Sequence, residues 1–499
     1  MHPRTMPGVS HERSPLIQHE EAGHNKQLLE FSKDDDENPR KWSKWKKLGN
    51  IALWLVCFIA IVSDVVFIDM EPVLSPLASS MFAPGVQQIA EALNTTETSV
   101  IACQAGFVVM LGVGPLLLAP LSETFGRKPL YLICFTIFTL LQIPTALSPN
   151  IAVLITFRTI AGFFGSVSIA NGGGTISDMY EPSERAGIFG WYLLGPLLGP
   201  TIGPLLGGII LENLDWPWLF WIMLMICGVV VLGTYFLLHE TYVPVLLSSR
   251  KKELEESSDV EFYYEGEDTR PFSSKVFQAV QRPLRILFTQ PIVFTMAAYQ
   301  ALIFATTYSL YTQFSSIYGG DYGFSTIEIG LTYLAPGLGF LSAVWFLVPR
   351  IDNVFNYLTK KNNGESKPEY RLPLANVGSV LLPISLFIFA WTVEYHVHWA
   401  VTLVATFFYG IGQVAIFNSV QNYYIDAFEK YAASAIAAGA FFRSVIGGVV
   451  PLITPSILDA VGVGWGISIF AFMAIALAPS PALFYYYGGW LRQRFAIDL

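Results

Sequence analysis

The chain has 499 residues, of which 53% are hydrophobic and 13% are charged, and its mean hydropathy is +0.49. This apolar content is more than one soluble core can bury, and the charged residues stand in blocks between long apolar runs, so the composition excludes an ordinary soluble domain and indicates a protein of the lipid bilayer. The net charge of −9 leaves no broad basic face, which excludes a nucleic-acid-binding protein.

The chain begins with a polar segment, residues 1–48, that includes the acidic run Asp34–Glu37. This segment lacks the basic and then apolar pattern of a secretory signal peptide. We therefore expect a disordered cytoplasmic tail.

Twelve apolar runs of about 18 residues or more follow, and they predict twelve transmembrane helices. Their approximate ranges are 50–72, 98–120, 130–148, 151–173, 187–210, 218–239, 291–315, 327–349, 373–393, 399–423, 433–456 and 465–489. The predicted fold class is an all-α membrane protein with two bundles of six helices. We expect the bundles to occupy 49–240 and 291–490, joined by a cytoplasmic linker over 241–290 and followed by a short tail over 491–499.

The distribution of Lys and Arg predicts the orientation. When the twelve ranges alternate across the bilayer, the loops on one side hold the basic clusters, from Arg40–Lys47 before the first helix to Arg492 after the last. The six loops on the other side contain no Lys or Arg. Because cytoplasmic loops carry the excess of basic residues, we expect both termini in the cytoplasm. Residues 275–288 of the linker suit a helix that lies on the inner membrane surface.

The first predicted helix carries Asp64, the acidic residue nearest the middle of a predicted span. A proton-coupled carrier needs a group whose protonation changes as access alternates, and no histidine lies deep in a predicted span. We therefore predict Asp64 as the proton-carrying group. The neighbouring Asp69 and Glu71 lie nearer the outer boundary and fit surface acids.

The loop between the second and third predicted helices, Ala119–Lys128, reads APLSETFGRK. Gly126 permits a tight turn, while Glu123 and Arg127 can form charge pairs that hold one conformation and break in another. We predict that these residues and Lys128 form a conformational gate. The alternative is a basic anchor that only fixes the orientation.

The fourth predicted helix carries Arg158 about 10 Å from its outer end. A central arginine costs about 2.5 to 3.5 kcal/mol to insert, so it should face a cavity or a partner. We predict a role in proton coupling. The alternative is a static ion pair or a side chain that reaches the membrane surface.

The fifth predicted helix contains Gly199–Gly208, GPTIGPLLGG. Small residues four positions apart let helices touch closely, and prolines bend a helix, so this segment can form a tight but mobile contact between the bundles. The predicted pivot residues are Gly199, Pro200, Gly203, Pro204, Gly207 and Gly208. The alternative is an ordinary packing face of small residues.

The two halves of the sequence repeat each other. Gly162 precedes Asp178 at the end of the fourth helix by the same interval by which Gly410 precedes Asp426 at the end of the tenth. The second and eighth helices also both run into an acidic residue. This pattern favours duplication of a six-helix unit, with a binding site between the two copies.

The seventh and tenth predicted helices supply the candidate substrate contacts. Phe304, Tyr308 and Tyr311 follow the spacing of one helical stripe. An aromatic wall with a few hydrogen-bonding groups would suit a lipophilic, partly polar compound, although such a stripe is more often packing. The other candidates are Tyr299, Gln300, Gln413, Asn418, Asn422 and Arg443 of the eleventh helix, whose role is open between structure and function.

Several of these motifs resemble a known family. Ala119–Lys128 resembles the cytoplasmic loop signature of the major facilitator superfamily, with Ala119, Glu123 and Thr124 as departures, and Gly199–Gly208 matches the antiporter signature of that superfamily. Further stretches look like its fungal drug:proton antiporter branch: Asn38–Trp42, Asp178–Arg185, His239–Pro244 and Pro368–Leu372. The resemblance covers roughly residues 38 to 495, and Pro217 departs from a usual arginine.

This resemblance implies twelve helices, residence in the plasma or vacuolar membrane, and export of drugs, toxins, polyamines or secondary metabolites. It adds Asp178 and Arg185 to the predicted gate, and Arg158 matches the fourth-helix arginine implicated there in proton coupling.

The expected function is therefore proton-coupled antiport of a small organic molecule out of the cell. The alternatives are a proton symporter for nutrient uptake and a membrane sensor that does not transport. We expect no enzyme activity, because no nucleophile and base cluster, and no metal site or cofactor. The expected partners are the lipid bilayer, protons and a small-molecule substrate, and the expected state is a monomer.

Overall fold

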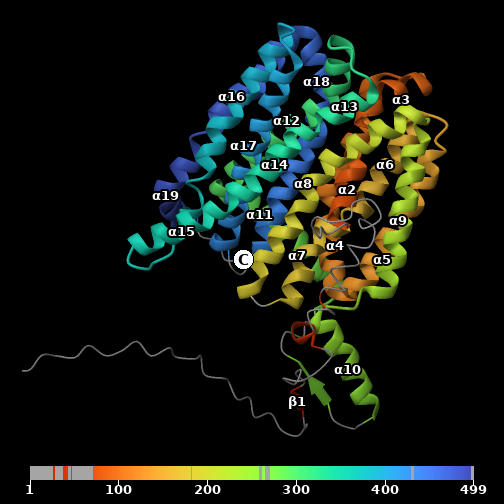
Figure 1. Cartoon of the computed structure of the whole chain (residues 1–499). Coiled ribbons are helices and arrows are strands. Elements are labelled where there is room, and N and C mark those ends of the chain that lie inside the picture. Colours follow the sequence, from red (N-terminus) through yellow and green to blue (C-terminus); the bar gives the residue numbers. More distant parts are fainter. Residues whose placement is uncertain are drawn as a thin grey trace, which may run out of the picture.

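The computed structural model describes residues 26–28, 38–42, 47, 71–180, 182–257, 261–264, 270–428 and 432–495. Figure 1 shows long helices packed side by side in a bundle, with α10 (Val243–Ser257) hanging below it. Two short strands, β1 (Lys26–Leu28) and β2 (Glu261–Tyr263), pair in parallel beside α10. We call the end of the bundle near α10 the linker end, and the end with α3 (Val86–Ala92) the far end.

The first half of the bundle follows the predicted spans closely. Its elements, after the short η1 (Pro39–Lys41), are α2 (Glu71–Ser80), η2 (Ala83–Gly85), α3, α4 (Glu97–Phe125), α5 (Arg127–Ala146), α6 (Ile151–Gly165), α7 (Val167–Met179), α8 (Pro182–Asn213) and α9 (Pro217–Leu237). Polar caps mark where helices begin at the far end, since the side chain of Thr96 accepts a hydrogen bond from Ser99 N and that of Asn150 accepts one from Val153 N.

The second half begins after α10 and the amphipathic α11 (Phe272–Thr289), which covers the linker segment predicted to lie on the membrane surface. Its elements are α12 (Pro291–Phe314), η3 (Ser315–Asp321), α13 (Thr326–Thr332), α14 (Leu334–Phe346), α15 (Val348–Lys361), η4 (Pro368–Arg371), α16 (Ala375–Glu394), α17 (Trp399–Ala427), α18 (Ala432–Leu477) and α19 (Ser480–Arg494).

The predicted twelve-helix membrane fold is confirmed. Within the described residues, nine helical stretches are long and apolar enough to cross a membrane. One of them, Ser434–Arg494, contains two passes, because Gly462 breaks the helix with a φ of 82° and a ψ of 163°. The 32-residue α8, and α2 at the close of the first predicted span, complete the set.

One predicted boundary was wrong. The first span was expected to end near residue 72, with an outer loop over 73–97, but that range forms α2, η2 and α3. Three serines made the segment look polar, yet they are buried. Ser79 and Ser80 both donate hydrogen bonds to Pro76 O, at 2.7 and 3.1 Å, so the helix satisfies its own hydroxyl groups and continues. Asp64 and Asp69 lie outside the described residues.

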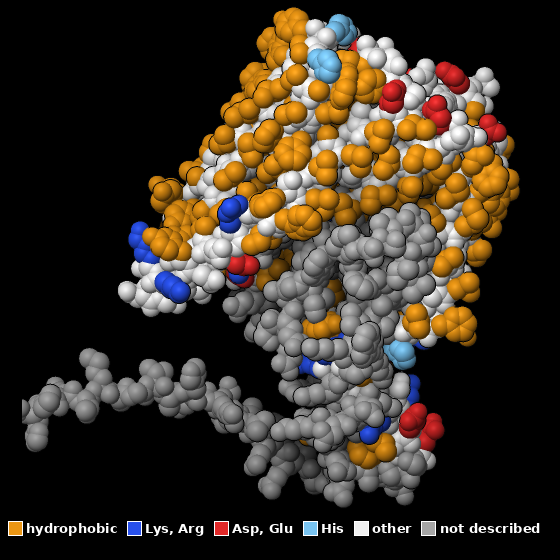
Figure 2. Space-filling model, viewed as in Figure 1, with side chains coloured by type: hydrophobic (Ala, Val, Ile, Leu, Met, Phe, Trp, Pro, Cys, Tyr) orange, Lys and Arg blue, Asp and Glu red, His pale blue; other side chains and the backbone are white. Residues whose placement is uncertain are grey.

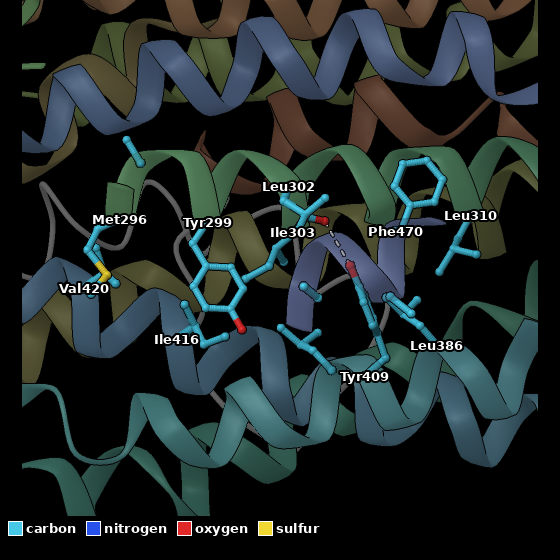
Figure 3. Packing of buried hydrophobic residues seen from close by; sticks show 14 of the residues in the cluster. Met296, Tyr299, Leu302, Ile303, Leu310, Leu386, Tyr409, Ile416, Val420 and Phe470 are labelled. Atoms are coloured by element: carbon cyan, nitrogen blue, oxygen red, sulfur yellow. Dashed lines mark hydrogen bonds between the residues drawn. The ribbon is translucent and has the colours of Figure 1, made fainter. Parts of the chain in front are cut away.

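Each half packs around its own apolar core. One cluster of buried side chains runs from α2 to α9, and another runs from the end of α11 to α19. Figure 3 shows part of the second cluster, where Tyr299 of α12 packs beside Ile416 and Val420 of α17. Outside, apolar side chains cover the flanks of the bundle, while acidic side chains and histidines gather at its far end (Figure 2). This surface fits a bundle that is surrounded by lipid.

Candidate functional site

The two halves touch along a seam where α8 meets α13 and α4 meets α18. A Cβ added to Gly208 would lie 2.7 Å from Thr326 O, and one added to Gly330 would lie 2.9 Å from Pro204 O. On the other flank, a Cβ on Gly448 would lie 2.8 Å from Ala105 O. Glycine is therefore required for these backbones to approach so closely.

The predicted pivot segment of α8 lies at this seam and against α2. A Cβ on Gly203 would lie 2.8 Å from Leu77 O, and one on Gly207 would collide with Met81 O. The Ser80 hydroxyl of α2 donates to Gly199 O at 3.4 Å. Pro200 is half-buried. The predicted small-residue positions thus bring α2, α8 and α13 together.

Three described polar contacts join the halves near the far end, one of them from Gln88 Nε2 to Thr326 Oγ1 at 3.5 Å. The hydroxyl groups of Ser79 in α2 and Tyr308 in α12 lie 3.2 Å apart. Ser315 Oγ donates to Pro84 O at 2.8 Å. These bonds would have to break if the halves separated at the far end.

A cluster of Arg127, Asp178 and Glu240, which we call the linker-end cluster, joins α5, α7 and the end of α9. Arg127 Nε lies 3.2 Å from Asp178 Oδ2. The Glu240 carboxylate accepts from the backbone N–H groups of Arg127 at 2.9 Å and Lys128 at 3.1 Å. It also accepts from Thr241 N and Tyr242 N, at 3.0 and 2.9 Å. One carboxylate therefore caps the start of α5 and fixes the start of the linker.

Gly126 makes this arrangement possible. Its φ is 100°, a conformation that favours glycine, and a Cβ there would collide with the Glu240 carboxylate. The Arg127 guanidinium lies 5.0 Å from the ring of Tyr242. Burial raises the pKa of Tyr242 to about 12. The phenol therefore stays neutral and carries no negative charge that would compete with Asp178 for Arg127.

The structure places the predicted gate residues in different surroundings. Among the described ion pairs Arg127 is held by Asp178, while Glu123 is exposed, and the gating role of these residues stays a prediction. Lys128 contributes its backbone N–H. Arg185 lies in α8, and its side chain is outside the described part of the structure. Sequence reasoning missed Glu240, whose partners in α5 lie more than 110 residues away.

The second half contains a matching cluster. Arg371 of η4 lies 2.7 Å from Asp426 and 2.5 Å from Asp352, and its guanidinium lies 3.9 Å from the ring of Phe355. Asp426 is the residue that the internal repeat equates with Asp178. Both halves therefore use an arginine at the start of their third helix to hold the aspartate at the end of their fourth.

Arg158 of α6 is enclosed in the first half. Its side chain is 1% exposed, and one guanidinium nitrogen donates to Ala78 O of α2 at 2.8 Å. Its charge lies 4.4, 5.0 and 5.6 Å from the rings of Phe107, Phe82 and Phe220. The aromatic faces and the carbonyl oxygen stabilise the charge without a carboxylate among the described residues.

The predicted aromatic stripe on α12 divides between two environments. Phe304 and Tyr308 stack edge to face with centroids 4.9 Å apart at the seam. Tyr311, instead, packs against Tyr333 at 5.0 Å inside the second half, and Tyr299 is buried in the same core (Figure 3). Helix α12 is almost wholly buried, so one stripe meets different neighbours at different heights. In this structure Tyr299 and Tyr311 are therefore buried in the core of the second half, and their role as substrate contacts stays a prediction.

The predicted polar contacts of α17 are largely engaged within the second half. Gln413 accepts from Thr307 Oγ1 at 3.0 Å. Asn418 donates to Val414 O at 3.4 Å, and Asn422 donates to Asn418 O at 2.8 Å. Gln300 and Arg443 differ, because Gln300 Nε2 and Oε1 and Arg443 Nε and Nη1 are buried without a hydrogen-bond partner among the described residues.

The sequence is similar to a known family of membrane transporters and to individual fungal members of it. The sequence profile of the Major Facilitator Superfamily matches residues 73–451. MFS-type transporter penM of Penicillium rubens is 38% identical over 465 residues, covering 92% of this chain and 88% of that protein. Efflux pump radE of Floropilus chiversii is 36% identical over 471 residues, covering 93% and 85%.

Solved structures share the fold at low identity. A D-xylose-proton symporter aligns with a TM-score of 0.61 and 14% identity, over 83% of this chain and 95% of that one. A bacterial homologue of the human lysosomal transporter Spinster, in an inward-facing and unoccupied conformation, aligns with a TM-score of 0.57 and 12% identity, over 92% and 99%.

Proposed function

Because the chain belongs to the major facilitator superfamily and is a membrane transporter of that fold, we propose that it is a proton-coupled antiporter that exports a small organic molecule by alternating access. The observation that carries this proposal is the packing of the α8 glycines against α2 and α13. These contacts put the pivot segment at the junction of the halves, where a rocking motion must bend or slide. The name of radE, an efflux pump, is consistent with export.

The far-end contacts and the two ion-pair clusters have separate parts in this cycle. Opening at the far end would break the Ser79–Tyr308 and Ser315–Pro84 bonds. The Arg127 and Arg371 clusters each lie within one half, so they keep that half rigid at the linker end while it rotates.

Arg158 and Asp64 are the proposed proton-coupling pair. Arg158 supplies a fixed charge in the first half and donates to Ala78 O of α2. A shift of α2 would therefore change the electrostatic surroundings of the Arg158 guanidinium. Asp64 lies outside the described residues, and its part in the pair rests on its place in the sequence.

The setting follows from the same proposal. We place the transporter in the plasma membrane, with a vacuolar membrane as the alternative, and both termini in the cytoplasm. It acts as a monomer on protons and a small molecule, without a metal or cofactor.

The test is flux in proteoliposomes that contain the purified full-length chain. With an imposed pH difference and a panel of fluorescent organic compounds, antiport predicts compound movement against the proton flow, together with a pH change that requires the compound. Movement in the same direction as the protons would identify a symporter instead. Absence of both flux and pH change for every compound would refute transport by this chain.

The pivot can be tested with one substitution and a matched control. Gly208→Leu places a side chain against Thr326 O, so that α8 and α13 can no longer pack closely. Because the halves then cannot close at this contact, we expect flux to fall at least tenfold. Gly228→Leu on α9, where no atom lies within 4 Å of an added Cβ, should keep wild-type flux. Equal flux in the two variants would contradict a pivot at the α8–α13 contact.

A further inference from the structure

We propose that Arg443 binds the anionic group of the transported molecule, so that the substrates are lipophilic organic acids with a single negative charge. This inference rests on the proposed transport function and names the substrate class. It depends on two unpartnered donors of Arg443, on an unpartnered amide beside it and on its place at the seam.

Arg443 is a buried charge without a counter-ion in the described part of the chain. Its Nε and Nη1 atoms have no hydrogen-bond partner there, and its guanidinium lies 5.8 and 5.6 Å from the rings of Phe304 and Phe417. Among the described residues, the ionisable groups that act on it are Tyr424 and Tyr308. A charge with open donors inside a membrane protein is costly to maintain, which indicates a ligand that completes its bonds.

A second unsatisfied polar group lies beside it. Gly439, Arg443 and Gly447 are four residues apart on α18 and so share one face. A Cβ on Gly439 would lie 3.2 Å from Gln300 Oε1, and one on Gly447 would collide with the ring of Phe304. Arg443 therefore lies on the face between Gln300 and Phe304. Gln300 is 0% exposed, and neither end of its amide has a partner among the described residues.

The pair lies where the two halves meet. Ser444, the next residue of α18, faces Gly112 of α4, since a Cβ on Gly112 would lie 3.0 Å from Ser444 Oγ. Tyr308, one turn beyond Phe304, bonds to Ser79 of the first half. Arg443 as a whole is half-buried, although its Nε and Nη1 atoms are buried. Separation of the halves along this seam would therefore open its guanidinium to a ligand.

The chemistry of these groups selects the ligand. A guanidinium presents parallel N–H donors that match the two oxygens of a carboxylate, and a nearby amide N–H can donate to the same group. A single arginine balances a single negative charge. Phe304 and Phe417 offer apolar faces for the body of the molecule. A monoanionic organic acid with an aromatic or aliphatic body satisfies all of these groups.

The experiment compares a matched acid and amide. The full-length chain in detergent is titrated with 1-pyrenebutyrate and with 1-pyrenebutanamide, which differ in charge and share the same ring system. We expect the wild type to bind the acid at least tenfold more tightly. Arg443→Gln should lose that preference and leave amide affinity unchanged, whereas Arg443→Lys should retain part of it.

Two further variants keep the test decisive. Gln300→Leu should weaken acid binding about threefold to tenfold, whereas Gln290→Leu, which removes a buried amide that donates to Phe495 O, should not change the acid preference. Equal affinities of the wild type for acid and amide, or an equal loss of both in Arg443→Gln, would overturn the proposal. The proposal would also be overturned by an Arg443→Gln variant that binds the acid normally and loses only the compound-dependent pH change. Arg443 would then interact with an acidic residue of the protein and not with the ligand.

The outcomes separate this inference from the proposed function. Proton-driven export of neutral compounds without an acid preference would refute the Arg443 site alone. An acid preference that depends on Arg443, in protein that moves no compound, would refute transport and leave the site standing.

Discussion

Arg158 in the first half and Arg443 in the second half are both central arginines, but their surroundings differ. Arg158 has a carbonyl partner and three aromatic rings, and it is 1% exposed. Arg443 has two rings at greater distance, open donors and a half-buried side chain beside the seam. Arg158 Nε is also buried without a hydrogen-bond partner among the described residues, but another donor of Arg158 is bonded within its own half, whereas both Nε and Nη1 of Arg443 lack a partner there. Burial alone therefore does not distinguish the two charges, but the bonded donor and the closer rings show that Arg158 is the more fully stabilised of the two.

The largest expected effect comes from removing the enclosed charge. Arg158→Gln can still donate to Ala78 O, so we expect the fold to persist with a loss of about 2 kcal/mol from the ring contacts. Proton-driven flux should fall to that of empty vesicles, while binding of 1-pyrenebutyrate stays within about twofold. Flux and thermal unfolding of the purified variant test this. A variant with intact flux would show that the enclosed arginine is only structural.

The two ion-pair clusters extend the comparison to the linker end. Asp178→Asn removes the carboxylate that pairs with Arg127, and we expect the free energy of unfolding to fall by about 3 kcal/mol. Asp426→Asn leaves Arg371 with Asp352, so its cost should stay below about 1 kcal/mol. Thermal unfolding of both variants in the same detergent measures the difference. Equal losses would show that Asp352 does not support Arg371.

The smallest expected effect separates the rings around the two arginines. Phe107→Leu removes the ring nearest Arg158 and should lower the free energy of unfolding by about 2 kcal/mol without changing ligand affinity. Phe417→Leu should cost less than about 1 kcal/mol and weaken pyrenebutyrate binding severalfold, because its ring lies 5.6 Å from Arg443, the proposed binding charge. The reverse assignment of the two effects would contradict the contrast between the arginines.

The sequence predicted the spans well because each helix must present about 18 apolar residues to lipid, a requirement that composition alone reveals. The repeat of Asp178 and Asp426 also predicted correctly that the two halves correspond, and each aspartate pairs with an arginine of its own half. The end of the first helix was missed because buried serines bond to their own backbone and only look polar in the sequence.

Long-range bonds account for the other differences. No local sequence pattern predicts the role of Glu240, because its partners in α5 come close to it only when α9 packs beside α5. Tyr311 has the spacing of a stripe, yet its neighbour Tyr333 comes from another helix and turns it into a core residue. The open donors of Arg443 depend on which helices surround α18, so the sequence left its role undecided.

The Glu240 carboxylate has a consequence for how the two halves are connected. Since it holds both the start of α5 and the first residues after α9, the connection between the halves is tied down at one end before α10 begins. The effective tether is therefore shorter than residues 241–290 suggest. A truncated tether would first strain the hydrogen bonds from Arg127 N and Lys128 N to Glu240, at the start of α5.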